Sequence, residues 1–521
     1  MHGYESVILP GGELTPEICQ RIVEARDPRY DGVFFVAITT TRIYCRPVCP
    51  ARVVHRERRR FFASAAAAEH AGYRPCLRCR PELAPGRALC DAVSRLASAA
   101  AHRIAAGALN GRSVVALARE LCVSERHLRR ALERELGVSP VELAQSHRLL
   151  LAKQLLADTD LPIARVAYAS GFQSLRRFNA AFREHYRMPP SALRRTQRQT
   201  RAGRDGAGTL TVTLGYRPPF AWYELLAFLR PRALPGVEVV GPNRYTRTLR
   251  IGDCAGVISV RDGAHANGRG YVPGDRRTGH VTVDISADLI PALMPLLSRV
   301  RHLFDLDAEP AVVDAHLAQS GMAELVALRR GLRMPGAIDG FEVALDVLLR
   351  AGDVRPAAAS ALARRIVCAL GEPIETGIPG LGWLAPTAHR VADAGAAKLE
   401  EVGVPRLRAL AIAATARAIA DGRVRLDVGS DVDGTQAALA EATGIARSLA
   451  ALIVMRAVRW PDTLPADDPA LQCAAGVQDA KSLLARAERW RPWRGYAAQH
   501  LYTCAQTSAY SYGRDPSLRS G

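Results

Sequence analysis

The sequence lacks the features that would place the protein in or across a membrane. It contains no stretch of about 18 consecutive apolar residues, the length that a spanning helix requires. Its first residues, MHGYESVILPGGELTPE, have neither the basic stretch nor the clean apolar core of a secretory signal. These absences predict a cytoplasmic protein with no membrane partner.

The cysteines do not follow the pattern of a disulfide framework. The chain has 11 cysteines, an odd number, and all but four of them stand singly. Scattered single cysteines are typical of reduced residues in a protein core. Only the four that form two close pairs indicate chemistry.

Acidic residues are scarce relative to basic ones, and the imbalance is local. The 70 Lys and Arg residues outnumber the 51 Asp and Glu residues, which gives a formal net charge of +19. Up to residue 208 the difference is 34 minus 19, or +15, and over the remainder it is 36 minus 32, or +4. This asymmetry predicts that the N-terminal part binds a polyanion, nucleic acid rather than membrane lipid, and that a more neutral C-terminal part folds separately.

Two close cysteine pairs lie in the basic part of the chain. Cys45 and Cys49 are separated from Cys76 and Cys79 by 26 residues, a spacing typical of a tetrahedral site with four thiolates around Zn²⁺. A zinc-bound thiolate stays deprotonated at neutral pH, so the same sulfurs can hold a small domain together or supply a nucleophile. The alternative is a purely structural zinc knuckle.

Cationic side chains surround these pairs and are suited to a phosphate backbone. They are Arg42, Arg46, Arg52, His55, Arg56, Arg58, Arg59, Arg60, Arg74, Arg78 and Arg80. The run from His55 to Arg60 could equally be a solvated face.

From Leu89 to Arg195 the apolar residues recur with a helical period and include two helix-turn-helix patterns. In the first pattern, a helix from Ser124 to Glu135 begins at a good capping residue and is expected to bury Leu128 and Leu132. Its outward side chains, expected to contact DNA, are Arg126, His127 and Arg130.

The second helix-turn-helix pattern repeats this plan. A helix from Ser174 to His185 is expected to bury Phe178 and Phe182. Two such units in tandem predict two recognition helices in successive major grooves. The side chains expected to reach DNA here are Gln173, Ser174, Arg176, Arg177 and Asn179. The alternative is a helical packing domain whose arginines are simply solvated.

The segments divide the chain into a multidomain fold that is mainly α with α+β parts. The expected division is a small zinc domain (1–85), an all-α DNA-binding domain (89–195), a polar linker (196–208), a sheet subdomain (209–288), a helical body (289–506) and a disordered tail (507–521). The zinc domain is expected to open with a helix from Thr15 to Ala25 and a β-rich run over residues 32–44.

Three sets of residues resemble known families. The motifs CRPVC, Phe61-Phe62 and RPCLRCRP resemble the zinc domain of the Ada family, in which the first cysteine of the first pair accepts a methyl group from a DNA methylphosphotriester. The residues around Gly171 and Phe178, followed by Met188-Pro189-Pro190, resemble the AraC-type activator domain. The third part resembles the AlkA glycosylases, helix-hairpin-helix enzymes that remove alkylated purines. No Pro-Cys-His-Arg motif is present, so the methylguanine-accepting domain that often follows in Ada is missing.

The resemblance to AlkA implies an antiparallel sheet subdomain and specific site residues. Gly444 is the one family glycine retained in the hairpin at residues 442–446, and Asp468 matches the catalytic carboxylate. Tyr502 replaces a tryptophan of the base pocket. Ser448 and Leu452 stand where the family has aromatic residues, and the wedge position is Ala351-Gly352. An alternative for Asp468 is an ordinary helix cap before Pro469.

Together the resemblances imply an adaptive-response protein. Stoichiometric methyl transfer to Cys45 would switch on sequence-specific binding to double-stranded DNA, with RNA polymerase as a partner, and the C-terminal part would excise bases of the 3-methyladenine type. The alternative is a methylation-triggered regulator whose AlkA-like part is catalytically degenerate and only binds DNA.

Overall fold

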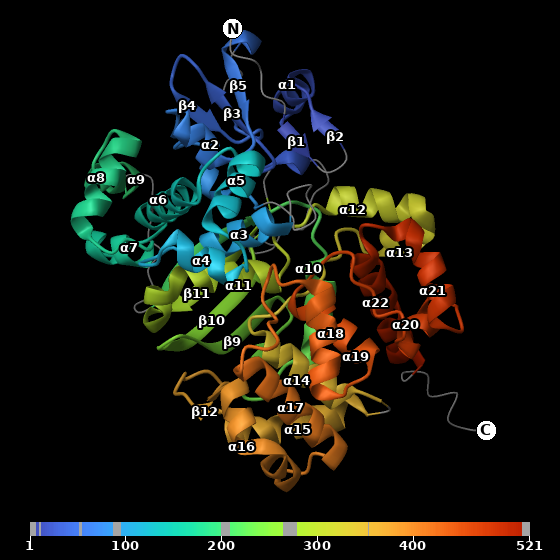
Figure 1. The fold of residues 1–521 in the computed structure, drawn as a ribbon. Helices are drawn as coiled ribbons and strands as arrows, with labels where there is room; N and C mark the ends of the chain where they lie inside the picture. The colour runs from blue at the N-terminus through green and yellow to red at the C-terminus, as the bar shows by residue number, and fades with distance from the viewer. Residues whose placement is uncertain are drawn as a thin grey trace. The chain divides into compact units, whose positions relative to one another are not determined.

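The chain divides into two compact units (Figure 1). Unit 1 contains Met1–Pro218, Arg250–Arg301 and Leu306–Ala308, and unit 2 contains Pro219–Leu249, His302–Asp305 and Glu309–Gly521. The computed structural model describes residues 7–9, 12–51, 55–86, 95–198, 209–263, 279–352 and 354–512. Across these ranges, no helix combines the length and apolarity needed to cross a bilayer.

The N-terminal part of unit 1 is built on a small four-stranded sheet. Its strands are β3 (Phe35–Ile38), β4 (Ile43–Cys45), β5 (Arg59–Phe62) and β6 (Arg74–Pro75), in the order β5-β3-β4-β6. The other elements are the hairpin of β1 (Val7–Leu9) and β2 (Gly12–Leu14) and the helices α1 (Pro16–Ala25) and α2 (Ala65–His70). Thr15 caps α1, which confirms the predicted first helix. Strands β3 and β4 confirm the predicted β-rich run.

The next part of unit 1 is helical, as its apolar period predicted. The helices are α3 (Arg95–Ala105), α4 (Val114–Glu120), α5 (Glu125–Leu136), α6 (Pro140–Asp158), α7 (Ile163–Ala169), α8 (Leu175–Tyr186) and α9 (Pro190–Arg198). The pairs α4–α5 and α7–α8 form the two helix-turn-helix units, and α6 connects them. The four side chains expected in their cores are all 0% exposed: Leu128, Leu132, Phe178 and Phe182.

Helix α9 corrects the predicted start of the linker. It ends at Arg198, so residues 196–198 are helical. Leu193, 1% exposed, anchors the helix in the apolar interior, and nothing in the three residues that follow Arg195 breaks a helix. The remainder of the predicted linker, 199–208, lies outside the described residues.

The strands after the linker form antiparallel pairs, as the resemblance to AlkA implied. In unit 1, β11 (Gly279–Ser286) lies between β7 (Thr209–Tyr216) and β10 (Cys254–Asp262). Strand β8 (Glu238–Val240) pairs antiparallel with β9 (Arg244–Ile251). Helix α10 (Trp222–Leu229) was not predicted, because its run WYELLAFL is apolar on nearly every side and shows no helical period. Helix α11 (Leu293–Leu303) follows the last strand.

Unit 2 is mostly helical. Its helices after residue 309 are α12 (Pro310–Leu317), α13 (Ala323–Leu328), α14 (Gly340–Arg350), α15 (Pro356–Leu370), α16 (Ala388–Glu401), α17 (Arg406–Ala420), α18 (Val432–Thr443), α19 (Arg447–Ala457), α20 (Pro469–Ala474), α21 (Ala480–Ala487) and α22 (Arg494–Tyr512). A short pair of strands, β12 (Glu372–Pro373) and β13 (Trp383–Leu384), lies between α15 and α16.

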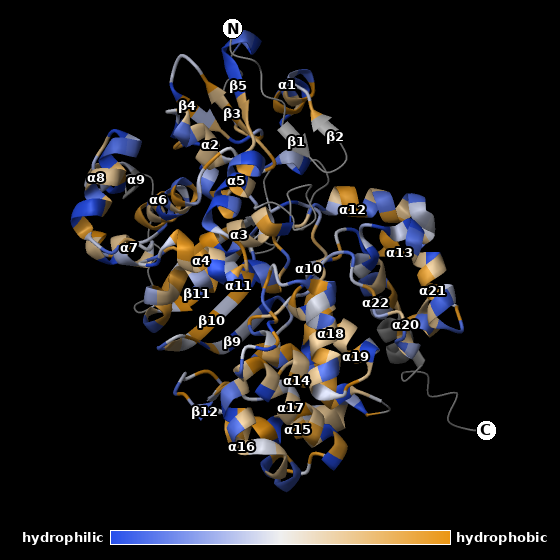
Figure 2. Ribbon diagram, viewed as in Figure 1, coloured by the Kyte–Doolittle hydropathy of each residue, from blue (hydrophilic) through white to orange (hydrophobic). Residues whose placement is uncertain are grey.

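One large apolar core holds these helices together. Buried residues of α14, α15, α16, α17 and α19 meet in it, and the ribbons of these helices carry many hydrophobic positions in Figure 2. Ile366, Val391, Ile412 and Ile453 are each 0% exposed. Helix α19 therefore rests on a rigid base, which fixes the hairpin turn that precedes it.

The last helix corrects the predicted start of the tail. Helix α22 runs to Tyr512, so residues 507–512 are helical rather than disordered. The small and polar residues there carry no helix breaker before Gly513. The rest of the predicted tail, 513–521, lies outside the described residues.

Candidate functional sites

The four paired cysteines converge on one point in unit 1. Cys45 ends β4 and Cys76 directly follows β6, and these two strands run parallel. Their carboxyl ends therefore lie at the same edge of the sheet. All four sulfur atoms, including those of Cys49 and Cys79, lie within 4.8 Å of one another.

The donor set fits a zinc ion. Four thiolates about 2.3 Å from one ion would stand about 3.8 Å apart at the corners of a tetrahedron. Backbone N–H groups of Arg46 and Arg78 donate to the sulfurs of Cys79 and Cys76, both at 3.4 Å, as expected around thiolates.

The arginines near the cluster have different roles. Arg46 points inward and is 4% exposed; its Nε donates to Asp31 at 2.8 Å and its Nη1 donates to the Cys79 carbonyl at 3.2 Å. Arg56 forms a bidentate pair with Glu24 at 2.8 Å, and Arg59 is buried against Gln20. The basic run after His55 is thus partly structural.

A buried polar network ties the segment from Cys76 to Glu82, called here the cysteine loop, to helix α6. The Lys153 ammonium donates to the Cys76 carbonyl at 3.1 Å and to Glu82 at 2.5 Å. Arg80 forms a bidentate pair with Asp158, at the end of α6, at 2.7 and 2.8 Å. Sequence reasoning missed this network, although a lysine within the apolar run LLLAKQLLA was a signal.

The predicted DNA-reading residues lie on α5 and at the start of α8. Arg126, His127 and Arg130 are exposed on α5, and so are Gln173, Arg176 and Arg177 at α8. Ser174 has a structural task, because its hydroxyl caps α8 by accepting from the Arg177 backbone N–H at 3.5 Å. Asn179 is half-buried.

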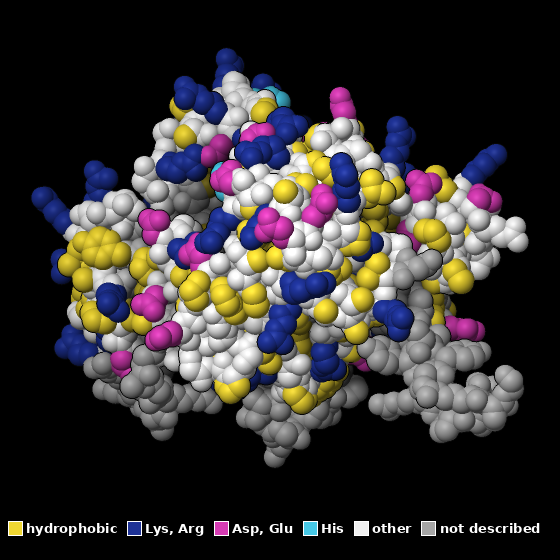
Figure 3. Space-filling model, turned by 90° about the horizontal axis from the view of Figure 1, so that it is seen from below, with side chains coloured by type: hydrophobic (Ala, Val, Ile, Leu, Met, Phe, Trp, Pro, Cys, Tyr) yellow, Lys and Arg dark blue, Asp and Glu magenta, His cyan; other side chains and the backbone are white. Residues whose placement is uncertain are grey.

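On the face drawn in Figure 3, Lys and Arg side chains are spread among Asp and Glu and do not gather in a single patch.

The predicted hairpin of unit 2 is the turn between α18 and α19. Gly444 ends α18 with φ +67°, and its backbone N–H donates to the Ala440 carbonyl at 2.9 Å. Among the described residues, no neighbouring atom lies within 4 Å of the place where a Cβ would stand, so this face of the turn is open to them. A DNA backbone could therefore approach it.

Asp468 and Tyr502 are brought together, although 34 residues separate them. Asp468 caps α20 by accepting from the Ala470 backbone N–H at 2.9 Å, and its other oxygen accepts the Tyr502 hydroxyl. Burial, and then the Asp468 charge, hold the pKa of Tyr502 well above its usual value. Asp468 thus has the capping role and, in addition, a phenolic donor.

The other AlkA-like positions are less complete. Ser448 and Leu452 lie on α19 and are partly buried, without the aromatic surface of the family. Gly352, at the wedge position, has φ +75°, and no atom of the described residues lies within 4 Å of the place where its Cβ would stand. Among the described residues at these positions, Asp468 and Tyr502 share a hydrogen bond.

Three family models match the chain in the same order as these sites. They are the metal binding domain of Ada over residues 18–82, a helix-turn-helix domain over 117–196 and the AlkA N-terminal domain over 211–339. The four-cysteine cluster is accordingly a zinc-binding site.

Curated relatives cover nearly the whole chain. A "Probable bifunctional transcriptional activator/DNA repair enzyme AlkA" from Mycobacterium tuberculosis is 35% identical over 94% of this chain and 96% of that protein. "DNA-3-methyladenine glycosylase 2" from Escherichia coli is 31% identical over 56% of this chain and 96% of that protein. The "Bifunctional transcriptional activator/DNA repair enzyme Ada" of Escherichia coli is 32% identical over 36% of this chain and 50% of that protein.

The sites and matches define a class of zinc-binding, helix-turn-helix proteins joined to a glycosylase-type body. Within this class, the chain belongs to the family of bifunctional transcriptional activator and DNA repair proteins of the AlkA type.

Proposed function

We propose that the protein repairs methylphosphotriesters in DNA by moving the methyl group to Cys45, and that this transfer switches on sequence-specific DNA binding. The observation that carries the proposal is the four-cysteine cluster, held at one sheet edge by β4 and β6 in the segment that matches the metal binding domain of Ada. Relatives named for both transcription activation and DNA repair support it.

The transfer is a substitution at the methyl carbon. The Cys45 thiolate forms an S–C bond as the C–O bond breaks, and the electron pair of that bond stays on the phosphate oxygen as a phosphodiester anion. Zinc, when bound, keeps the thiolate deprotonated at neutral pH. Because a thioether is a poor leaving group, each molecule reacts once.

The same step changes the charge that DNA meets. Four thiolates around a divalent ion carry a formal charge near −2, and a thioether in place of one thiolate removes one negative charge. At about 6 Å from a phosphate and an effective dielectric constant of about 20, this is worth about 3 kcal/mol before screening. A gel shift with promoter DNA tests the switch: wild type gains affinity after reaction with methylphosphotriester DNA, and a zinc-loaded Cys45→Ala variant does not.

Helices α5 and α8 are the elements proposed to select the DNA sequence. Their exposed Arg126, Arg130, Arg176 and Arg177 can contact phosphates or base edges in two successive major grooves. RNA polymerase is the partner proposed at such a promoter. Pull-down of polymerase by promoter-bound, methylated protein tests this contact.

We propose a second activity, removal of alkylated bases, for unit 2. The Asp468 carboxylate would stabilise positive charge on the sugar as the base departs, with the amides near Gly444 holding the backbone. Incubation of purified protein with methylated duplex, followed by alkaline cleavage, tests the activity. Strand breaks that disappear in Asp468→Asn support it.

A second candidate function is a regulator whose unit 2 only binds DNA. It is favoured by the small side chain at Ser448, by the lack of a side chain at Gly352 and by the capping role of Asp468. Absence of strand breaks at high protein concentration, together with retained DNA binding, would select this alternative.

A further inference from the structure

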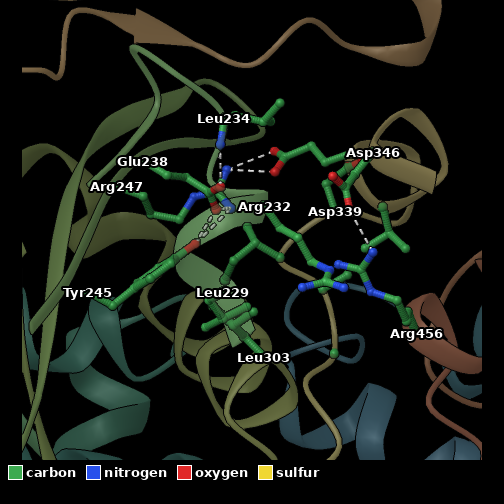
Figure 4. A pocket seen from close by; sticks show the side chains of 15 residues that line it. Leu229, Arg232, Leu234, Glu238, Tyr245, Arg247, Leu303, Asp339, Asp346 and Arg456 are labelled. Carbon is green, nitrogen blue, oxygen red and sulfur yellow. Dashed lines mark hydrogen bonds and ion pairs between the residues drawn. The ribbon is translucent and has the colours of Figure 1, made fainter. Parts of the chain in front are cut away.

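Seven of the 15 residues that line a small pocket in unit 2 have charged side chains (Figure 4). Its volume is about 40 Å³, space for about three or four water molecules and too little for a flat bicyclic base. The charged residues that line it are Arg232, Glu238, Arg247, Asp339, Glu342, Asp346 and Arg456.

The charges on one wall satisfy one another. Arg247 donates to both carboxylate oxygens of Glu342 at 2.8 Å and to Glu238 at 3.1 Å. Asp339 caps α14 by accepting from the Phe341 backbone N–H at 2.8 Å. One arginine and three carboxylates sum to +1 −3, or −2, so this wall does not itself attract an anion, and each of these groups is held by a hydrogen bond within the wall.

The other wall carries an excess of positive charge. Asp346 accepts from Arg456 at 2.6 Å with one oxygen and from Arg350 with the other. The Arg232 guanidinium stacks on the Phe228 ring, 3.8 Å from its centroid, and Figure 4 shows it beside the guanidinium of Arg456. The two arginines and the one carboxylate that line this wall sum to +2 −1, or +1, and Arg350, which pairs with Asp346 but does not line the pocket, adds a further positive charge nearby.

Two further observations indicate that this wall is suited to a ligand. Arg456 is 8% exposed, and its Nε is a buried donor that has no acceptor among the described residues. Burial, and then the neighbouring charge of Arg456, lower the pKa of Arg232 to about 9. Both features cost folding free energy and are relieved when an anion enters.

We propose that Arg232 and Arg456 bind a phosphate group in this pocket. Arg232 Nη1 already donates to the Phe228 carbonyl at 2.9 Å and Arg456 Nη1 to Asp346 at 2.6 Å, so the two guanidinium groups are fixed on one side of a small space. Phosphate supplies the acceptor that Arg456 Nε lacks and a negative charge beside both cations. A carboxylate offers fewer oxygens than phosphate. The pocket size favours a single oxyanion over a base.

The proposed site also acts on the Asp468 region. The charges of Arg232 and Arg456 both lower the pKa of Tyr502, whose hydroxyl donates to Asp468. A phosphate between the two arginines would weaken this effect. Phosphate binding itself does not require that unit 2 be a glycosylase, so the two proposals fail separately.

Calorimetric titration of the full-length protein with inorganic phosphate, at constant ionic strength in a chloride buffer, tests the site. Arg232→Met keeps an apolar contact with Phe228 and removes one guanidinium. We expect saturable binding to wild type, at least about tenfold weaker binding to Arg232→Met, and unchanged binding to a control, Arg364→Met, at an exposed position of α15.

Thermal unfolding in phosphate-free buffer separates binding from folding. Because Arg232 stands beside Arg456, Arg232→Met should unfold at the same temperature as wild type or higher, and phosphate should no longer raise that temperature. A second variant, Arg456→Lys, keeps the charge beside Asp346 but loses the fork, and should also bind more weakly. Equal binding by all variants, no binding by wild type, or a lower unfolding temperature for Arg232→Met would overturn the proposal.

The source of the phosphate is resolved by a nucleotide probe. Thymidine 5′-monophosphate that binds at least as well as inorganic phosphate, with thymidine inactive, would show that the site accepts a phosphate carried by a nucleotide. Binding of inorganic phosphate alone would assign a free ion. Either result supports the oxyanion site.

Discussion

Lys153 of helix α6 donates a hydrogen bond to the carbonyl oxygen of Cys76, a residue of the zinc-binding cluster. Its ammonium also pairs with Glu82, and the two side chains are 2% and 1% exposed. A buried charge pair thus joins the cysteine loop to α6, the helix between the two helix-turn-helix units. Breaking it should disturb both.

Lys153→Met should strongly destabilise unit 1. Glu82 would keep Arg80 but lose its closest cation, and an uncompensated buried charge costs about 3 kcal/mol or more. Hydrogen exchange at the backbone of α6 during chemical denaturation measures the change, with the exposed Lys481→Met as control. Unchanged stability in Lys153→Met would mean that the pair does not contribute to the free energy of unfolding.

The same pair predicts a dependence on pH. Burial raises the pKa of Glu82, but Lys153 and Arg80 lower it more, so that it lies below its usual value. The stabilisation from this carboxylate is therefore present above the unfolded pKa of about 4.3 and is lost as the pH falls through the lower folded value. The loss should be smaller in Glu82→Gln, as denaturation at pH 5 and at pH 3 would show.

The buried pair of Arg46 and Asp31 should hold the cysteine loop closed. Asp31 is 1% exposed, and Arg46 links it to the Cys79 carbonyl. Asp31→Asn leaves Arg46 without a countercharge and should cost about 3 to 5 kcal/mol. Faster zinc release to a coloured chelator is the readout, with Glu24→Gln, whose carboxylate is exposed, as control. Equal release rates would contradict this role.

Asp314 in unit 2 should give the opposite sign of pH dependence. Burial raises its pKa to about 6, and its Oδ1 is a buried acceptor without a donor among the described residues. Because the folded pKa exceeds the unfolded one, the stability of unit 2 should fall as the pH rises from about 4 to 6. Asp314→Asn should remove this dependence and stabilise the unit at pH 7.5 on the order of 1 kcal/mol. A variant less stable than wild type at pH 7.5 would refute the expectation.

Base excision, if it occurs, should depend on both members of the Asp468–Tyr502 contact. Asp468→Asn should lower the rate about 100-fold or more because it removes the charge that stabilises the sugar cation. Tyr502→Phe removes one hydrogen bond to that carboxylate and should change the rate less. Asp467→Asn is the matched control, since Asp467 is exposed. Equal rates in Asp467→Asn and Asp468→Asn would exclude Asp468 from catalysis.

The sequence was most informative where a side chain acts locally. The cap residue Ser124, the buried Phe178 and Phe182, and the spacing of the cysteine pairs depend on neighbours a few residues away or on one metal, so the pattern predicted them. The cap at Asp468 was also foreseen, as an alternative to catalysis. These are features with a short-range cause. Ser174 was predicted as a DNA contact, and its role as the cap of α8 was not foreseen.

Contacts between distant segments were not predictable from the pattern. The inward orientation of Arg46 depends on Asp31, and the burial of Lys153 depends on Glu82. Arg232, which follows α10, and Arg456, on α19, lie close together only in the folded chain. For each of these charged residues the sequence pattern alone predicts an exposed side chain, because the partner that allows its burial is distant in the sequence. Arg232 and Arg456, the two residues proposed to bind phosphate, are both of this kind.

Mass spectrometry of the zinc-loaded protein after incubation with methylphosphotriester duplex tests the central claim most directly. The account predicts a gain of one methyl group on the peptide that contains Cys45, no further gain with excess substrate, and no gain in Cys45→Ala with zinc retained. A methyl group on another cysteine, or an unmodified peptide after complete binding of damaged DNA, would contradict it.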